Sequence, residues 1–337
     1  MNISNLPTAK KLILKKRPGK DFDEENFEVI EDLAKAPEKD ELLIKVDTLA
    51  IDAWIRTTLH EGSYHDSAQE GNVISALGIG EVLISKSKKF QEGDFVSGPL
   101  GAQTHSTMHA AAFNKIHNPQ LDPEVNIGLI GLTSGLTAYF GLIDVGKVKE
   151  GETVVVSGAA GGVGIIVCQL AKVLGAKVIA IAGGPEKCSY LLNDLEMDHV
   201  IDYKNSNVEN ELESIAKDKI DVFFDNVGGD ILDAVLDNLN TGARVAICGA
   251  ISQYSDMKNV IGPKKYLKLA ENYASMEGFT VMHFSEKFEE ATQKLLSLYE
   301  EGKIVVPTHY ENGIESFPRA LKMLFTGGHT GKLMVKI

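Results

Sequence analysis

The stretch "VVVSGAAGGVG", residues 154–164, joins three valines to a run of small residues that suits phosphate binding. In a dinucleotide-binding βαβ unit, one glycine makes a tight turn, a second lets the backbone approach the pyrophosphate, and a third allows close helix–strand contact. Gly161 and Gly164 fill the last two roles, and Gly162 adds backbone freedom. Ala159 stands where the first glycine is expected, which is tolerable if its φ is negative. A small-residue crossover without a ligand is the alternative, but the apolar strand before and the periodic helix after favour a cofactor loop.

The end of the next expected strand distinguishes NAD from NADP. A site for NAD carries Asp or Glu there to bind the ribose 2′-hydroxyl. Gly183 and Gly184 occupy that point, and Lys187 follows at the start of an expected helix. A lysine there opposes the helix dipole unless an anion accompanies it. Together with Tyr203 at the end of the following strand, Lys187 predicts a site for the 2′-phosphate of NADP. The alternative is that Lys187 is a solvated surface lysine.

No metal or nucleophile motif accompanies the loop. His105 and His109 are four residues apart, but "GPLGAQTHSTMHAAAF" is expected to form strand and turn, and no acid or cysteine stands nearby to complete a metal site. The same interpretation, as surface or packing residues, applies to His60, His65 and His117. G-x-S-x-G is absent, and Cys248 at a strand end is interpreted as a buried structural thiol. We therefore predict no bound metal.

The elements that position these residues alternate along the second part of the chain. Strands are expected at "TVVVSGA", "KVIAIAG", "HVIDY", "IDVFFDNVG" and "ARVAICGA", with helical segments between them. This alternation implies βαβ units and a parallel sheet. "MEGFTVM" is expected to be a further strand, and "FSEKFEEATQKLLSLYEEGKI" a single amphipathic helix over residues 284–304.

The rest of the chain is β-rich. "ELLIKVDTLAID" alternates, and the tail "GKLMVKI" is a last strand outside the βαβ alternation. We expect an α/β protein with a β-rich domain over residues 1–126 and a doubly wound parallel-sheet domain over residues 127–309. Residues 310–337 are expected to return to the first domain.

Composition narrows the function classes. The 337 residues carry a formal net charge of −13, which argues against nucleic acid as a partner. The apolar stretch over residues 125–145 is interrupted by Asn126, Asp144 and four glycines, so we predict a buried helix or helix pair and no membrane partner. The N-terminus has no apolar signal core, and the three cysteines form no close pair. These features fit a cytoplasmic protein.

Five segments carry a resemblance to a known family: "GLTAYFGL", "KEGETVVVSGAAGGVG", "FDNVGG", "CGAISQY" and "GKLMVKI". Over nearly its whole length the chain is similar to the zinc-independent medium-chain dehydrogenase/reductases. Within them it most resembles the branch of prostaglandin reductases (leukotriene B4 12-hydroxydehydrogenases) and alkenal double-bond reductases. The Gly-His-Glu element and four-cysteine lobe of zinc-containing relatives are absent. The resemblance implies a GroES-like catalytic domain, a Rossmann domain, a homodimer and NADPH-dependent reduction of the carbon–carbon double bond of α,β-unsaturated aldehydes or ketones.

The resemblance also implies roles for individual residues. The pyrophosphate loop matches Gly161, Gly162, Val163 and Gly164, and the 2′-phosphate contacts match Lys187 and Tyr203. The segment lining the nicotinamide half matches Asn226, Cys248, Gly249, Ala250, Ile251, Ser252 and Tyr254. The strand beside the nicotinamide matches Phe279 and Val281.

Three departures from the family pattern bear on substrate and cofactor contacts. The usual D-P-Y-M-R is Asp-Ala-Trp-Ile-Arg over residues 52–56, and Ser134 replaces the proline of M-P-G-L-T-A-Y. His329 replaces an asparagine that contacts the cofactor. The candidate substrate-pocket residues are Trp54, Arg56 and Tyr139.

The expected reaction is hydride transfer to the β-carbon of an enal or enone, followed by protonation of the enolate. Negative charge develops on the carbonyl oxygen, so a hydrogen-bond donor is needed there. Tyr254 is the candidate, because a phenol donates while neutral near pH 7; the alternative is an aromatic residue that only covers the cofactor. Two other functions stay open: a quinone reductase of the same superfamily, and a non-catalytic NADPH-binding protein of the crystallin type.

Overall fold

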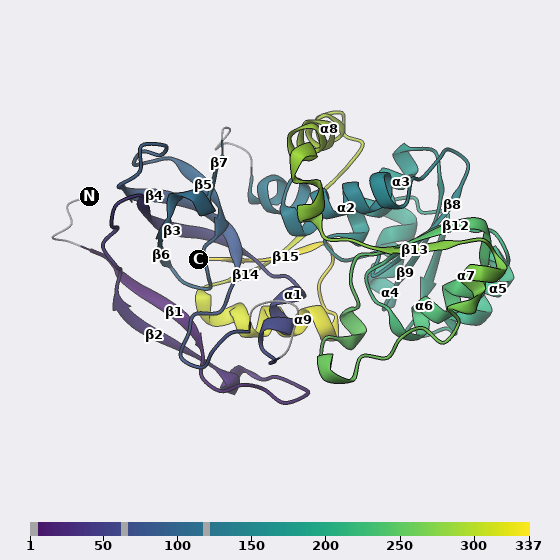
Figure 1. Ribbon diagram of the computed structural model, residues 1–337, viewed down its shortest axis with the longest axis horizontal. Helices are drawn as coiled ribbons and strands as arrows, with labels where there is room; N and C mark the ends of the chain where they lie inside the picture. The colour runs from purple at the N-terminus through teal and green to yellow at the C-terminus, as the bar shows by residue number, and fades with distance from the viewer. Residues whose placement is uncertain (1–5, 62–66, 117–121) are drawn as a thin grey trace. The chain divides into compact units, whose positions relative to one another are not determined.

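The protein, shown in Figure 1 as a computed structural model, is described for residues 6–61, 67–116 and 122–337. The chain divides into two compact units. The β-rich unit comprises Met1–Ile127, Tyr254–Lys258 and Thr308–Ile337, and the parallel-sheet unit comprises Gly128–Gln253 and Asn259–Pro307. The short segment Tyr254–Lys258, which the sequence pattern places in the second domain, therefore groups with the β-rich unit.

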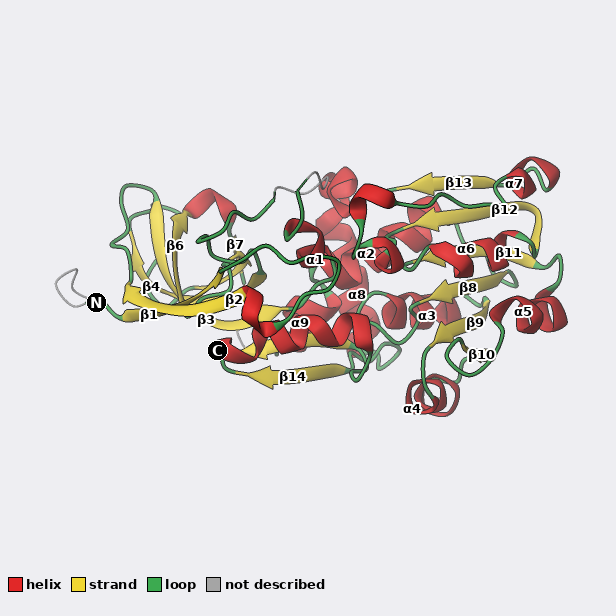
Figure 2. Ribbon diagram, turned by 90° about the horizontal axis from the view of Figure 1, so that it is seen from below, coloured by secondary structure: helices red, strands yellow, loops and turns green. Residues whose placement is uncertain are grey.

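The parallel-sheet unit is built on six strands in the order β10-β9-β8-β11-β12-β13. Each neighbouring pair is parallel, and Figure 2 shows the six arrows side by side in this order. Their bounds are β8 (Thr153–Ser157), β9 (Lys177–Ala182), β10 (His199–Asp202), β11 (Ile220–Asp225), β12 (Leu239–Ile247) and β13 (Ser275–Gly278). The strand order reverses between β8 and β11, so the predicted Rossmann sheet is confirmed and its topological switch point lies between these strands.

Helices cover both faces of this sheet (Figure 1). The helices α5 (Val208–Ala216) and α6 (Gly229–Leu236) share a hydrophobic cluster with Phe223 of β11. Phe224 faces the opposite side, as pleating requires, and a Cβ on Gly141 would lie 2.5 Å from its ring. The other helical segments between residues 124 and 300 are η3 (Glu124–Leu129), η4 (Leu132–Leu136), α2 (Thr137–Phe140), η5 (Gly141–Val145), α3 (Gly164–Val173), α4 (Pro185–Ser189), η6 (Tyr190–Asp194), η7 (Ile251–Gln253), η8 (Met257–Asn259), α7 (Leu267–Glu271), η9 (Val281–Lys287) and α8 (Phe288–Glu300).

The prediction of a single helix over residues 284–304 is wrong. The 3₁₀ segment η9 is interrupted by a kink at Phe284, whose φ of −111° and ψ of 18° are not helical, and the α-helix of this region, α8, spans only Phe288–Glu300. Aromatic packing accounts for the kink, because the Phe284 ring stacks on Phe140 with centroids 4.8 Å apart and planes 3° from parallel. The amphipathic period marked the helical face but carried no information on this aromatic contact.

The β-rich unit has an antiparallel pair, β1 (Thr8–Leu14) with β2 (Phe27–Leu33), and a seven-stranded sheet. The sheet order is β14-β15-β3-β4-β5-β7, and β6 also pairs with β3. The strands of this sheet are β3 (Glu41–Ala50), β4 (Leu77–Ser85), β5 (Phe95–Pro99), β6 (His105–His109), β7 (Asn114–Lys115), β14 (Thr308–Asn312) and β15 (Lys332–Lys336). The helical segments are η1 (Glu24–Asn26), α1 (Trp54–Thr58), η2 (Ala110–Ala112), η10 (Ile314–Ser316) and α9 (Phe317–Thr326). Because β15 pairs antiparallel with β3, the last strand of the chain lies in this sheet.

Both faces of β3 are covered. Leu42 and Ile44 belong to the large core of the β-rich unit, which also contains Phe317 and Leu321 of α9. Leu43, on the other face of the strand, belongs to a separate small cluster. Burial on both sides explains why three consecutive apolar residues are fully buried in a strand that the sequence presents as alternating.

The apolar stretch Glu124–Val145 is long and apolar enough to cross a membrane by composition, yet 61% of its most apolar window is buried in the protein. Phe140 in its second half is fully buried and contacts the rings of Phe284 and Phe288. The stretch is therefore packed as a core helix, broken into short turns, as the sequence analysis predicts.

Candidate active site

The turn after β8 is made by Gly158. Its φ of +60° is the left-handed conformation that favours glycine. Ala159 follows with a negative φ, since it is absent from the described non-glycine residues with positive φ, and its side chain is fully buried. The substitution at the expected first glycine is therefore accommodated as predicted, because the turn is made one residue earlier in the chain.

Gly164 starts α3 at a point where the backbone folds back closely on itself. A Cβ there would lie 2.3 Å from the carbonyl oxygen of Gly158 and 2.8 Å from Cα of Ala159. At Gly161 a Cβ would meet only the Gly158 oxygen, at 3.3 Å, so one side of the loop stays open. The N–H of Gly161 donates to the Gly158 carbonyl at 3.0 Å, and Gly162 and Val163 then lead into α3. The first N–H groups of a helix have no partner within the helix, and this is the arrangement that binds phosphate.

A buried carboxylate organises the neighbouring loop after β11. Asp225 is fully buried, and its Oδ1 accepts hydrogen bonds from Ser157 Oγ at 2.7 Å and from the backbone N–H of Val227 at 2.9 Å. The N–H of Gly228 reaches both carboxylate oxygens, at 3.0 and 3.1 Å. Ser157 Oγ in turn accepts from the N–H of Asn226 at 2.8 Å. The ends of β8 and β11 are thereby held together at the switch point.

The same network reaches the segment after β12. The N–H groups of Cys248 and Gly249 donate to the backbone carbonyl of Asp225, at 2.9 and 3.1 Å. The N–H of Ile251 donates to the Asn226 carbonyl at 3.1 Å, and Ser252 Oγ donates to the Val227 carbonyl at 2.6 Å. Ala250 completes this segment, and its Cβ would lie 3.2 Å from a Cβ on Gly228. The structure thus brings Asn226 and residues 248–252 together at the carboxyl edge of the sheet.

Burial sets the protonation of the groups in this network. Desolvation raises the pKa of Asp225 above its ordinary value, although its hydrogen bonds act in the opposite direction. Desolvation, followed by the charge of Asp225, raises the pKa of Cys248 to about 12. The Cys248 thiol is therefore not an activated nucleophile at neutral pH, although the residue is half-buried and not buried as the sequence analysis predicts.

Lys187 and Tyr203 follow the ends of the neighbouring strands β9 and β10, respectively. The Tyr203 ring lies on the backbone of Gly183, where a Cβ would be 2.6 Å from its Cζ. Lys187 lies partly buried in α4, and burial followed by the charge of Lys204 lowers its pKa. Among the described residues, Lys187 forms no ion pair. This corner presents cationic and phenolic donors with no carboxylate at the second-strand position, as an anion site requires.

Phe279 and Val281 lie beyond the strand that the sequence predicts for them. The strand β13 ends at Gly278, and Val281 begins the 3₁₀ segment η9. Phe279 is buried in an aromatic cluster with Phe224, at a centroid distance of 6.2 Å. The turn begins here because the Phe279 ring packs inward over Gly141, where a Cβ would lie 2.4 Å from it.

The remaining candidates divide between the two units. Tyr254 and His329 are buried in the β-rich unit, and Trp54 is the first residue of its helix α1. Tyr139 belongs to α2 of the parallel-sheet unit, where burial, followed by the charges of Glu290 and Asp144, raises its pKa.

Arg56 lies in the core of the β-rich unit. It is 1% exposed, and its guanidinium donates to the Lys20 carbonyl at 2.6 Å, contacts His60 and lies over the ring of Phe22 at 5.2 Å. Burial lowers the pKa of Arg56 to about 10. These contacts use the guanidinium to hold the chain around α1, so we propose a positioning role for Arg56.

Within the described ranges, no group of three or more His, Cys, Asp or Glu side chains is arranged to hold a metal ion. His105 and His109 stand at the two ends of strand β6, as the sequence analysis expects, and the His109 side chain accepts a hydrogen bond from Ala111 N–H. His65 and His117 lie outside the described residues.

Comparison with known proteins follows the same division of the chain. Residues 162–297 match the family described as zinc-binding dehydrogenase, and residues 10–116 match the one described as N-terminal domain of oxidoreductase. The chain is 39% identical to a putative NADP-dependent oxidoreductase of Bacillus subtilis, over 89% of each chain. It is 36% identical to a 2-alkenal reductase (NADP(+)-dependent) of Nicotiana tabacum, over 90% of this chain and 89% of that one. The chain belongs to the zinc-independent medium-chain dehydrogenase/reductase family. The solved structure of CurA from Vibrio vulnificus in complex with NADPH superposes with a TM-score of 0.91 at 31% identity, covering 97% of this chain and 98% of that one.

For this member of the medium-chain dehydrogenase/reductases, sequence reasoning missed three residues that shape the site. Gly158, Ser157 and Asp225 received no role, although the turn and the hydrogen-bond network depend on them. No local signal marks Asp225 as buried, because aspartate is almost never fully buried unless it has a partner. The partner of that acid, 68 positions away, leaves no trace in the local pattern.

Proposed function

We propose that this NADP-dependent oxidoreductase reduces the carbon–carbon double bond of α,β-unsaturated aldehydes or ketones, without a metal. The observation that carries the proposal is the near full-length similarity to a 2-alkenal reductase. It is combined with loops at the carboxyl edge of the parallel sheet whose shape fits a dinucleotide. Each part alone is less specific, because many functions share one fold.

The described residues fit NADP(H). Gly164 leaves the space at the helix start that a Cβ would fill, and Gly161 keeps the phosphate side of the loop open. Lys187 and Tyr203 supply a cation and a hydroxyl for the 2′-phosphate, while Asn226 and residues 248–252 lie on the nicotinamide side of the switch point. When bound, the cofactor supplies a hydride.

The protein's own part in the reaction is to stabilise charge on the substrate oxygen. As negative charge develops there, Tyr254 donates a hydrogen bond from its phenol and remains neutral near pH 7. Phe279 and Val281 belong to the proposed nicotinamide surroundings, and His329 to the cofactor contacts. Trp54 and Tyr139 are proposed to line the substrate pocket.

The test is Tyr254→Phe, assayed with NADPH and an enone. Loss of one oxyanion donor lowers kcat/KM by about 10²-fold. Tyr299→Phe in α8 is the matched control, because it removes a phenol oxygen from a partly buried residue outside the proposed site. A kcat/KM for Tyr254→Phe within about twofold of the native value would remove the donor role.

The substrate class has its own test. NADPH oxidation is measured in parallel with a short enal, a long-chain enone and a quinone. We expect the highest kcat/KM with an enal or enone. A preference for the quinone would identify a quinone reductase, and NADPH binding without turnover of any of the three would identify a non-catalytic binding protein.

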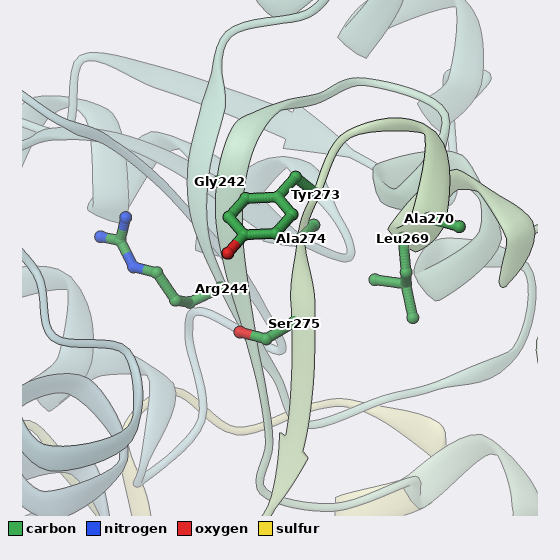
Figure 3. A pocket seen from close by; sticks show the side chains of 7 residues that line it. All are labelled: Gly242, Arg244, Leu269, Ala270, Tyr273, Ala274 and Ser275. Atoms are coloured by element: carbon green, nitrogen blue, oxygen red, sulfur yellow. The ribbon is translucent and has the colours of Figure 1, made fainter.

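We also propose that the protein is a homodimer, supported by the free edge of the parallel sheet. β13 is the terminal strand, and all four of its residues are exposed. Apolar side chains lie exposed around it, including Leu267, Tyr273 and Met276. A hollow of about 550 Å³ adjoins this edge. It is lined by the residues labelled in Figure 3, which are Gly242, Arg244, Leu269, Ala270, Tyr273, Ala274 and Ser275. Unpaired sheet edges attract other strands, and a lysine on an edge strand opposes such pairing. Met276→Lys should therefore yield monomers in sedimentation velocity. A native protein that is itself monomeric would contradict the proposal.

A further inference from the structure

The last strand of the chain carries a buried ion pair at the point where it meets β3. Lys332, the first residue of β15, contacts Asp52 Oδ1 through its Nζ, and the two side chains are 4% and 6% exposed. The N–H of Ile51 donates to the Leu333 carbonyl at 3.0 Å, which continues the antiparallel pairing of β15 with β3. In this register Lys332 stands directly opposite Asp52. The ion pair therefore closes the end of the ladder between the two strands.

This ion pair is poorly suited to stabilising the fold. The buried carboxylates of the described chain are those of Asp52, Asp94 and Asp225. Of these, only Asp52 has an oxygen, Oδ2, with no hydrogen-bond partner among the described residues. Asp94 uses both oxygens, since Oδ1 pairs with Lys115 at 2.7 Å and Oδ2 accepts from the N–H of Gln91 at 2.9 Å. A buried ion pair offsets its loss of hydration only when its remaining polar atoms are also bonded, and fixing a register is the best-attested use of the others.

The apolar residues of these two strands do not fix their register. Residues 333–335 of β15 are all buried, and so are residues 49–51 opposite them in β3. A strand that is apolar on both faces has no polar face to keep in water, so its pattern specifies the register weakly. The loop that leads into β15, residues 327–331, contains three glycines with positive φ, so its backbone adapts easily. A slip of β15, however, would leave the Lys332 ammonium buried without its carboxylate, which is strongly unfavourable.

We propose that the Asp52–Lys332 ion pair fixes the register of β15 on β3 and thereby positions Trp54 and His329 for the ligands of the proposed reaction. Trp54, two residues after Asp52, is the first residue of α1, and His329 lies three residues before Lys332. A slip of one residue would move His329 by about 3.3 Å along the strand direction, which is more than a hydrogen bond tolerates. The inference rests on the proposed function, which assigns Trp54 to the substrate pocket and His329 to the cofactor contacts. Asp52 and Lys332 are therefore positioning residues.

The experiment replaces both members of the pair, because removing one alone leaves the other charge buried and can unfold the protein. Asp52→Leu combined with Lys332→Met leaves apolar groups of similar shape, which can be nearly neutral for stability. The matched control is Asp94→Leu combined with Lys115→Met, which removes the ion pair of β7 in the same sheet. Urea unfolding checks that both double variants of the full-length protein are folded. Fluorescence titration of the cofactor-free proteins with NADPH then gives Kd, a measurement that needs no turnover.

The expected result is that the Kd for NADPH rises about tenfold in the double variant at Asp52 and Lys332 and stays within about twofold of the native value in the control. The KM for an enone should rise with it, because Trp54 is displaced together with the loop.

A double-mutant cycle separates positioning from a general loss of structure. His329→Ala should weaken NADPH binding in the native protein but add little in the double variant at Asp52 and Lys332, because the loop has already moved. Lys187→Ala, which removes a proposed contact to the 2′-phosphate, should weaken binding by the same factor in both backgrounds. A pair that only supports the fold would change the urea midpoint and leave both Kd and this non-additivity absent.

Several results overturn the inference. These are equal Kd values for the two double variants, a full effect of His329→Ala in both backgrounds, or no effect of His329→Ala in the native protein. If the double variant at Asp52 and Lys332 does not fold, Asp52→Asn, which keeps one acceptor oxygen for Lys332, is compared with Asp94→Asn. Asp52→Asn should then have the higher Kd by about threefold or more, and equal values would overturn the inference.

The proposed function fails separately. Native turnover of an enal or enone, with an unchanged Kd in the double variant at Asp52 and Lys332, defeats the inference alone. Weakened NADPH binding in that variant, with no turnover of an enal or enone by the native protein, defeats the proposed function alone.

Discussion

The two loops at the switch point of the sheet reach defined shapes by opposite means. The loop after β8 depends on missing side chains, since Gly164 has no room for a Cβ and Gly158 has a positive φ. The loop after β11 depends on one side chain, Asp225, which gathers donors from both strands. The loop after β8 is fixed by steric fit, so its conformation is insensitive to pH but does not tolerate one added methyl group. The loop after β11 is held by hydrogen bonds to one carboxylate, so it tolerates small changes of shape but its stability depends on the protonation state of Asp225.

The largest effect is expected for Gly164→Ala. Alanine improves helix propensity, but its Cβ would lie 2.3 Å from a backbone oxygen, so the loop must move. We expect the free energy of unfolding to fall by about 3 kcal/mol and NADPH affinity to fall at least tenfold, by about 1.4 kcal/mol or more. Urea unfolding and fluorescence titration measure the two. Gly262→Ala is the control, because nothing lies within 4 Å of its added Cβ; equal behaviour of the two variants would refute the steric explanation.

Asp225→Asn tests the electrostatic loop. Replacing one acceptor oxygen by an amide leaves buried donors unsatisfied and lowers the free energy of unfolding by about 2 kcal/mol. The folded-state pKa of Asp225 is raised, so the folded protein binds the proton more tightly than the unfolded chain. Native stability therefore falls as pH rises from the ordinary carboxyl pKa through the raised one, and then levels off.

Asp225→Asn should lack that part of the pH dependence. Urea unfolding of both proteins between about pH 4 and pH 8 gives the difference directly. Ser157→Ala serves as the control, because it removes one hydrogen bond but keeps the titrating carboxylate. Parallel curves for native protein and Asp225→Asn would show that Asp225 is ionised throughout.

Gly158→Ala should have a smaller effect. Alanine at a φ of +60° costs about 1–2 kcal/mol, while its Cβ would meet only Asn226 and Val227 at ordinary contact distances. Thermal and urea unfolding measure the loss. An unchanged stability would mean that the turn is not held in the left-handed conformation.

Ala159→Gly restores the expected fingerprint glycine and should have the smallest effect. Because Ala159 already has a negative φ, glycine brings no relief and increases the freedom of the unfolded chain, lowering stability by about 0.5–1 kcal/mol. NADPH affinity should not change. A gain in stability or affinity would show that residue 159, and not Gly158, makes the left-handed turn.

The wrong and missing predictions share one feature. The amphipathic period predicts helix through Phe284, but the Phe284 ring stacks on Phe140, far away in the chain, and the backbone there is not helical. The strand predicted through Phe279 ends early for a similar reason, since its ring packs over Gly141. Tyr254–Lys258 follows a Rossmann strand in the chain, yet the segment groups with the β-rich unit.

The sequence by itself determined the βαβ alternation, the glycine-rich loop over residues 161–164 and the absence of an acid after β9, because each is a local pattern of period, glycine and charge. Only the tertiary structure decided which glycine makes the turn, and that Asp225 joins Ser157 across the switch point. It also decided that Lys187 remains without a carboxylate partner among the described residues. These are contacts between residues distant in the chain, and their energies depend on distance and burial, which local spacing does not encode.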